Sequence, residues 1–297
     1  MKVIVFFSEG MDHDKHSLGG KGASLCTLYQ RGFKVPNGFI VTVSAFEQYL
    51  RQIEFADTLE RLDRELCGLS SSTAVKALSL RARSKLLADE GKAVGLLKKD
   101  SFAALKRLEG DFFAVRSSAN IEDGRQTSFA GQFDTRLNVR KSDILDAVVN
   151  CWASLFNSRA LWTAKTAGVR LEQCKMAVVV QEMVHADISG VVLTQAPSNS
   201  ENLLVEAIQG YGESLVSGSV DPDQQCSVSR ATRTILRNTG APLMEESLVF
   251  QLADLALSVE NVFGEPQDIE YAVKDKNLFL LQSRPEVKRV NRIGNKK

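Results

Sequence analysis

The sequence has 297 residues, of which 44% are hydrophobic and 25% charged, and its formal net charge is +1. This size and composition predict one large or two medium-sized domains with full hydrophobic cores. Apart from a locally basic end at residues 288–297, no block of Lys and Arg indicates a nucleic-acid or membrane surface, and no apolar run reaches the length of a signal sequence or a membrane span. We therefore expect a cytoplasmic protein with neither a nucleic-acid nor a membrane partner.

The cysteines are scattered along the chain without any C-x-x-C spacing. This distribution indicates neither a zinc site nor a disulfide framework. We predict reduced thiols in the core. The five residues are Cys26, Cys67, Cys151, Cys174 and Cys226.

A Gly-Gly-Lys-Gly stretch follows the first predicted strand, Val3–Phe7, and opens a predicted helix with apolar residues at helical spacing. Lys21 stands at this glycine-flanked start. A lysine side chain and the helix amides together attract a phosphate there. The stretch lacks the spacing of a P-loop, so an ordinary surface lysine is the alternative.

The segment from Gln52 to Leu108 is predicted to be helical and highly charged, with an apolar stripe formed by Leu59, Leu62 and Leu66. The charged residues fill its other face. We interpret it as scaffold and assign it no chemistry.

A cation and two hydroxyls follow the short apolar strand Phe112–Val115, where Arg116, Ser117 and Ser118 emerge together. The small residues around Ser128 and Gly131 allow backbone amides to approach an anion closely. Both features favour a phosphate-binding loop. A polar surface loop with a structural arginine is the equally weighted alternative.

The apolar strand Met176–Gln181 ends in polar side chains. At a junction between two lobes, Gln181 and Glu182 are suited to hydrogen-bond an adenine edge, and a plain strand end is the alternative. Two further residues have open roles: the side chain of Glu206 faces either side of its strand, and Arg159 points either to solvent or to the phosphate site.

The last predicted hairpin carries alternating polar residues on both strands, in DIEYA (268–272) and LFLLQSRP (278–285). A three-residue turn at 275–277 would place Glu270 opposite Gln282 and Asp268 opposite Arg284 on one face. A carboxylate beside an amide oxygen suits Mg²⁺, and an arginine stabilises charge on a transferred phosphoryl group. A surface hairpin with a cross-strand ion pair is the alternative.

These motifs occur together in one order: GGKG, RSSANIEDGRQTSFAGQFDT, QEMVHADISGVVLT, GYGE with VDPD, and DIEY with QSRP. In this order the chain resembles the ATP-binding domain shared by phosphoenolpyruvate synthase, pyruvate phosphate dikinase and rifampin phosphotransferase. The resemblance covers residues 18–285. It implies an ATP-grasp fold of the α/β (α+β) class, with two lobes and the nucleotide in the cleft between them. We expect lobes at 1–175, with a helical insertion at about 45–110, and at 176–288, followed by a basic tail at 289–297.

The resemblance also implies a role for each matching residue, with ATP and Mg²⁺ as cofactors. In the first lobe, Lys21 and Arg116 grip the ATP phosphates, and Gly131 and Thr135 belong to the loop that closes over them. The adenine is held at the lobe junction by Gln181, Glu182 and Met183.

In the second lobe, the resemblance implies that Glu270 and Gln282 ligate Mg²⁺ and that Arg284 contacts the phosphates. Asp268 matches the motif as well. The catalytic set is then Lys21, Arg116 and Arg284. The loop at 124–126 departs from the usual family sequence.

Larger family members continue into a swivelling domain with a phospho-accepting histidine in a Thr-Ser-His setting, and the synthase and dikinase add a pyruvate-binding barrel. None of His13, His16 and His185 has that setting, so we expect all three to be non-catalytic. The chain is therefore expected to be a stand-alone or split phosphotransferase module that acts on a separately encoded phosphohistidine carrier domain. The alternatives are a stand-alone kinase with a small-molecule acceptor, for example in specialised metabolism or antibiotic modification, and a catalytically inactive nucleotide-binding regulatory protein.

Overall fold

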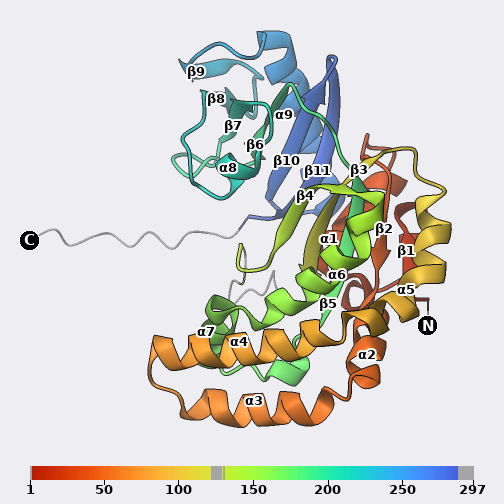
Figure 1. Cartoon of the computed structure of the whole chain (residues 1–297). Coiled ribbons are helices and arrows are strands. Elements are labelled where there is room, and N and C mark those ends of the chain that lie inside the picture. Colours follow the sequence, from red (N-terminus) through yellow and green to blue (C-terminus); the bar gives the residue numbers. More distant parts are fainter. Residues whose placement is uncertain (1, 122–128, 130, 287–297) are drawn as a thin grey trace, which may run out of the picture. The chain divides into compact units, whose positions relative to one another are not determined.

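The computed structural model describes residues 2–121, 129 and 131–286 (Figure 1). The chain divides into two compact units, Met1–Val184 and His185–Lys297. The sequence placed this division after residue 175. The structure has it later because the strand that follows residue 175 pairs on both sides with strands of the first unit.

The first unit contains a five-stranded antiparallel sheet in the order β1-β2-β5-β3-β4. Its strands are β1 (Ile4–Phe6), β2 (Gly38–Val41), β3 (Phe112–Ala119), β4 (Thr135–Arg140) and β5 (Met176–Glu182). Its helices are α1 (Lys15–Gln30), α2 (Val43–Gln52), α3 (Ala56–Gly68), α4 (Ser72–Ala88), α5 (Glu90–Leu105), α6 (Ile144–Ala153) and α7 (Ser158–Ala167). Short 3-10 helices lie at Phe7–Asp12, Lys141–Asp143, Ser154–Phe156 and Leu171–Gln173.

Strand alternation gives this sheet two differently covered faces. Phe113 and Val115 on β3 belong to the large core that also contains Trp152 of α6. The opposite face lies against α1. The packing there is close, since a β-carbon added to Gly22 of α1 would lie only 3.0 Å from Ile40 Cδ1 of β2. Residues 114, 116 and 118 of β3 therefore face α1.

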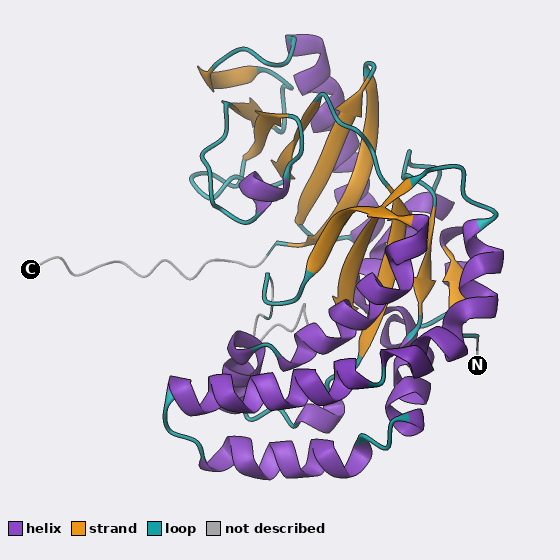
Figure 2. Ribbon diagram, in the orientation of Figure 1, coloured by secondary structure: helices purple, strands orange, loops and turns teal. Residues whose placement is uncertain are grey.

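The second unit contains a six-stranded antiparallel sheet in the order β11-β10-β6-β7-β8-β9 (Figure 2). Its strands are β6 (Ile188–Leu193), β7 (Asn202–Gln209), β8 (Gln224–Ser229), β9 (Ile235–Gly240), β10 (Gln267–Lys274) and β11 (Asn277–Pro285). Its helices are α8 (Glu213–Val216) and α9 (Glu246–Phe263).

Helix α9 covers one face of the second sheet. It contacts β6, β7 and β10 and buries an apolar stripe that includes Leu252 and Val259. Ile269 and Tyr271 of β10 are buried, each 1% exposed, on the side that α9 covers. The alternate residues Asp268 and Glu270 are half-buried and therefore lie on the opposite face.

Two antiparallel sheets with helices packed on them confirm the predicted α/β class. All five cysteines are free, as predicted, but Cys67 is exposed and so is not a core thiol. In the described part of the chain, no helix has both the length and the apolar character needed to cross a bilayer. The predicted basic tail, residues 124–126, Ser128 and Ala130 lie outside the described residues.

Candidate functional site

Lys21 follows a break in helix α1. The helix begins at Lys15 rather than at the glycine stretch, because Asp14 caps it by accepting a hydrogen bond from Ser17 N at 2.8 Å. Gly19 then leaves the helical conformation, with φ 70° and ψ 173°. The predicted glycine-flanked start is therefore a restart of the same helix, and half-buried Lys21 lies in its first turn.

Ser118 on β3 contacts α1 at this break. Its Oγ donates a hydrogen bond to Leu18 O at 3.0 Å and accepts one from Gly22 N at 3.0 Å. Arg116 precedes Ser118 by two residues and so lies on the same face of β3, the face that α1 covers. The fold thus brings the two predicted phosphate-binding cations, Lys21 and Arg116, to one side of one sheet.

Thr135 lies directly opposite Arg116. The two residues are paired across β3 and β4, and Thr135 is the first residue of β4 rather than part of a loop. Gly131, four residues earlier, has φ +68°, a left-handed conformation that favours glycine. Both Gly131 and Thr135 are exposed, as contact with a ligand requires.

The predicted adenine-binding segment is held by its own unit. Met183 N donates to Phe112 O at 3.0 Å, and Glu182 N donates to Asn37 O at 2.8 Å. The carboxylate of Glu182 accepts hydrogen bonds from the amides of Glu109 and Gly110, at 2.8 and 3.2 Å. These contacts fix the end of β5, and adenine binding by this segment stays a prediction.

Gln181 is 2% exposed, and its amide nitrogen donates to Pro36 O at 3.4 Å. The structure therefore buries this side chain instead of presenting it as a polar strand end. Arg159, whose direction the sequence left open, is exposed on α7.

The hairpin of β10 and β11 has the predicted pairs but a different turn. Lys274 pairs with Asn277, so the turn has two residues, Asp275 and Lys276, with φ 49° and 61°. Positive φ at both positions is typical of a type I′ turn. A register shift next to Glu270 then inserts one extra residue in β11, and it restores the predicted pairs of Glu270 with Gln282 and of Asp268 with Arg284.

Asp268 and Arg284 form an ion pair on this face. Arg284 Nη2 and Nε donate to Asp268 Oδ2 at 2.7 and 2.9 Å. The side chains are 30% and 18% exposed for Arg284 and Asp268, so the pair is partly shielded from solvent. This contact fixes the direction of the guanidinium.

Gln282 carries an unsatisfied oxygen. The side chain is 2% exposed, and its Oε1 is buried without a hydrogen-bond partner among the described residues. Burying such an acceptor costs about 1–3 kcal/mol. An orphaned amide oxygen directly opposite the Glu270 carboxylate is the donor set that a hard divalent cation takes, so these residues fit Mg²⁺. Within the described ranges, no group of three or more His, Cys, Asp and Glu side chains is arranged so that it could hold a metal ion.

Glu206 faces the same side of the sheet as Glu270. The register runs from Glu270 to Val191 on β6 and on to Glu206 on β7. Glu206 Oε1 accepts a hydrogen bond from Gln225 Nε2 at 2.7 Å. The structure thus decides the orientation that the sequence left open.

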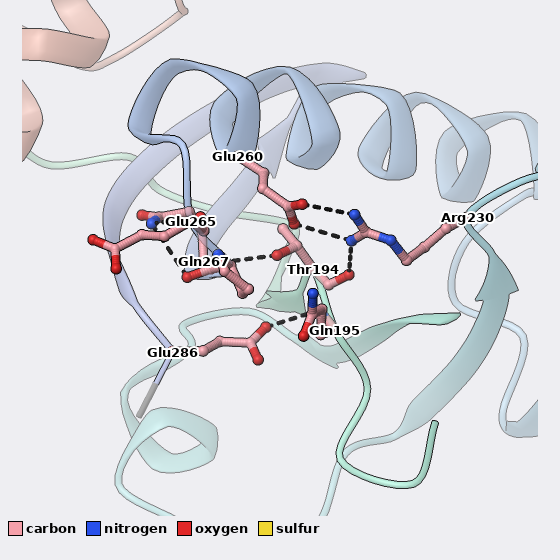
Figure 3. Close-up of polar contacts among 8 residues, drawn as sticks. Thr194, Gln195, Arg230, Glu260, Glu265, Gln267 and Glu286 are labelled. Atoms are coloured by element: carbon pink, nitrogen blue, oxygen red, sulfur yellow. Dashed lines mark hydrogen bonds and ion pairs between the residues drawn. The ribbon is translucent and has the colours of Figure 1, made fainter. Parts of the chain in front are cut away.

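A second polar network lies at the end of β11, and sequence reasoning missed it (Figure 3). Arg230 donates to both carboxylate oxygens of Glu260 at 2.9 and 2.6 Å and also to Thr194 O. Glu286 Oε1 accepts from Gln195 N at 2.9 Å. Burial, with the nearby carboxylates of Asp268 and Glu260, raises the pKa of Glu286 to about 7. Alternation beyond Arg284 was the one available signal for Glu286.

The predicted site residues fall into two groups. Lys21, Arg116 and Thr135 are gathered on the first unit, and the four hairpin residues are gathered on the second. Both groups contain cations of the kind that bind nucleotide phosphates. The second group also contains hard oxygen ligands of the kind that bind the Mg²⁺ of a nucleotide.

The comparisons with known proteins agree with this chemistry. The chain matches the family model of the pyruvate phosphate dikinase AMP/ATP-binding domain over residues 15–242 and 237–297. It therefore belongs to that family of AMP/ATP-binding domains, as its motifs indicated.

Among curated relatives, the chain is 34% identical to the probable phosphoenolpyruvate synthase of Methanothermobacter thermautotrophicus, over 96% of this chain and 46% of that protein. It is 36% identical to a rifampicin phosphotransferase of a Streptomyces species, over 90% of this chain and 34% of that protein. It is 34% identical to the prodigiosin synthesizing transferase PigC of Serratia marcescens, over 95% and 33%. The chain thus spans less than half the length of these relatives.

A solved structure of the ATP-grasp ligase PsnB with its minimal precursor matches 96% of this chain and 56% of that chain. The sequence identity is 10% and the TM-score is 0.32.

Proposed function

We propose that this chain is an Mg²⁺- and ATP-dependent phosphotransferase module. The observation that carries the proposal is the hairpin face: an Asp268–Arg284 ion pair beside a Glu270–Gln282 pair whose amide oxygen has no partner. Together they offer a hard-cation site and an oriented guanidinium, two of the recurring parts of a phosphoryl-transfer site.

Glu270 and Gln282 would hold Mg²⁺, which when bound neutralises charge on the phosphate oxygens. Arg284, held by Asp268, contacts the transferred phosphoryl group and stabilises the negative charge on its oxygens. Lys21 binds a phosphate as a point charge, whereas the planar guanidinium of Arg116 binds two oxygens at once. Catalysis by these residues consists of positioning and charge stabilisation.

The proposed acceptor is a histidine on a carrier domain, as the family resemblance implies: the histidine receives the β-phosphoryl group, the γ-phosphate is released to water as inorganic phosphate, and AMP is the nucleotide product. Relatives named phosphoenolpyruvate synthase support this proposal. None of the three histidines of this sequence lies in a Thr-Ser-His setting, so the proposed acceptor is a histidine of another domain.

A second acceptor class is a small molecule. The similarity to a rifampicin phosphotransferase, at 36% identity, is the specific observation that favours it. The third reading, a regulatory protein without catalysis, is not favoured, because the cations Lys21, Arg116 and Arg284 and the proposed metal ligands Glu270 and Gln282 are all present in the sequence.

The test is to incubate the purified chain with Mg-ATP labelled in the β or γ position, together with a purified phosphohistidine carrier domain or with a mixture of small molecules. Label on the carrier histidine with release of AMP supports the proposal. Label on a small molecule moves the function to the second acceptor class. Failure of the chain to bind ATP overturns the proposal altogether.

A further inference from the structure

The break in α1 is built around a glycine that no other residue replaces easily. Gly19 has φ 70°, and a β-carbon on it would lie 2.0 Å from Ser118 O and 2.3 Å from Ser118 Oγ. Both the left-handed conformation and the close approach therefore require glycine. The backbone of α1 at Gly19 therefore packs directly against Ser118 of β3.

The hydroxyl of Ser118 joins the two sides of this break. Leu18 and Gly22 are four residues apart, so the carbonyl of the first and the amide of the second are hydrogen-bond partners in an unbroken helix. Here Ser118 Oγ donates to that carbonyl and accepts from that amide, both at 3.0 Å. A side chain that enters a helix in this way fixes a kink at that point.

Ser118 is 0% exposed, so water does not take over either bond when the hydroxyl is removed. The helix uses the one donor of this hydroxyl and one of its two acceptor lone pairs. The position of one helical turn relative to β3 thus depends on one hydroxyl.

That turn contains Lys21, and β3 contains Arg116. Lys21 is the residue before Gly22, whose amide Ser118 binds. Arg116 lies two residues before Ser118 on the same face of the strand, about 7 Å along it. The Ser118 hydroxyl is therefore a direct hydrogen-bonded link between the backbones that carry the two cations.

We propose that Ser118 is a positioning residue, which sets Lys21 relative to Arg116 so that the two cations bind the same polyphosphate. The proposal rests on the proposed function, because it assumes that both cations contact ATP. We expect removal of the hydroxyl to leave the first unit folded but to let the Lys21 turn move. A displacement of about 1 Å at such a site lowers the catalytic rate by up to about 100-fold.

The experiment measures dissociation constants for ATP and for AMP by calorimetry in the wild-type chain and in S118A, K21A and the double variant. We expect S118A to weaken ATP binding by about tenfold or more, because the contact between the Lys21 charge and a phosphate is lost. The dissociation constant for AMP should stay within about twofold of the wild-type value. In the K21A background, S118A should have no further effect on ATP binding. The selectivity for ATP over AMP and the non-additivity are results that a merely structural role would not produce.

The matched control is S79A. Ser79 is also a buried serine of the first unit, whose Oγ donates to Phe156 O at 2.6 Å in the helical part. S79A should lower thermal stability as S118A does and change neither dissociation constant. If S118A does not fold, S118C fills the same space with a weaker hydrogen-bonding group and should shift ATP binding in the same direction.

Equal losses of ATP and AMP affinity in S118A, or additive effects of S118A and K21A, would overturn the positioning role. So would unchanged ATP binding in S118A when K21A weakens it. If K21A itself leaves ATP binding unchanged, the failure lies instead in the proposed phosphate site.

Discussion

Glu270 and Gln282 lie directly opposite one another on β10 and β11, and no atom in the described part of the chain is a hydrogen-bond partner of the Gln282 amide oxygen. Side chains directly opposite in an antiparallel pair are about 5 Å apart at their β-carbons. A buried polar atom without a hydrogen-bond partner lowers the stability of the fold. The position of this one beside a carboxylate supports the proposed Mg²⁺ site.

The first prediction follows from that unsatisfied oxygen. Q282M removes the orphaned acceptor and keeps the volume of the side chain, so we expect it to raise the melting temperature by a few degrees while it abolishes Mg²⁺-dependent ATP turnover. Calorimetric melting and a turnover assay at several Mg²⁺ concentrations measure the two effects.

The control for Q282M is Q224M. Gln224 is also buried, but its oxygen accepts from Met244 N at 2.8 Å and its nitrogen donates to Asn238 Oδ1 at 3.1 Å. Q224M should therefore destabilise the protein. A loss of stability in Q282M as large as that in Q224M would show that the Gln282 amide has a partner.

The second prediction concerns the Asp268–Arg284 ion pair. R284A should lower turnover by about 100-fold or more, and D268N by about tenfold, because it releases the guanidinium from its orientation. If Asp268 acts through Arg284, the double variant should be no slower than R284A. D254N, which removes the partner of Arg233 in an exposed ion pair, serves as the control and should leave turnover unchanged. Additive losses would show that Asp268 has a separate role.

Alternation along the two strands predicted both cross-strand pairs, yet the turn that was used to align them was wrong. The actual turn is one residue shorter, and the extra residue in β11 compensates. A two-residue turn depends on positive φ at Asp275 and Lys276, which neither side chain signals as clearly as Asn-Gly would. Gln282 and Arg284 both lie beyond the bulge, so they keep their alternation with each other and share one face, whereas the alternation is offset by one residue across the bulge.

Contacts between residues far apart in sequence were beyond prediction. The Glu182 carboxylate looked available for adenine, but the amides that it binds lie more than seventy residues away, at Glu109 and Gly110. The bridge from Ser118 to α1 spans a similar separation. Secondary-structure propensity depends on residues that are neighbours in the sequence, whereas these contacts depend on how β3, β5 and α1 pack.

The third prediction tests the turn itself. Lys276 has φ 61°, which costs a residue with a β-carbon about 1 kcal/mol or more relative to glycine. K276G should therefore stabilise the second unit and raise its melting temperature by about 2–4 °C. K276A keeps the β-carbon and should give no such gain. Equal stabilities of the two variants would argue against a strained turn.

The fourth prediction concerns pH and Glu286. Burial and the nearby carboxylates raise the pKa of Glu286 from 4.5 to about 7 in the folded protein. Between these values the folded chain holds a proton that the unfolded chain has lost, so stability from this group is full below pH 4.5 and is lost as pH rises through 7.

E286Q keeps an acceptor for Gln195 N and cannot ionise. Its melting temperature should match that of the wild type at pH 5 and exceed it at pH 8. The charged groups of Glu260, Asp268 and Arg230 that interact with position 286 are the same in both proteins, so the difference isolates Glu286. E265Q, at an exposed carboxylate, is the control and should show no such change with pH. A difference between E286Q and wild type that is the same at both pH values would contradict the raised pKa.

We propose that the hairpin face of the second unit, with Glu270 as an Mg²⁺ ligand, is required for phosphoryl transfer from ATP. The most direct measurement compares wild type with E270Q: each is incubated with Mg-ATP and a phosphohistidine carrier domain, and AMP, ADP and phosphohistidine are separated. We expect AMP and phosphohistidine with wild type and at least a 100-fold loss of both with E270Q. Equal product formation by the two proteins would contradict it.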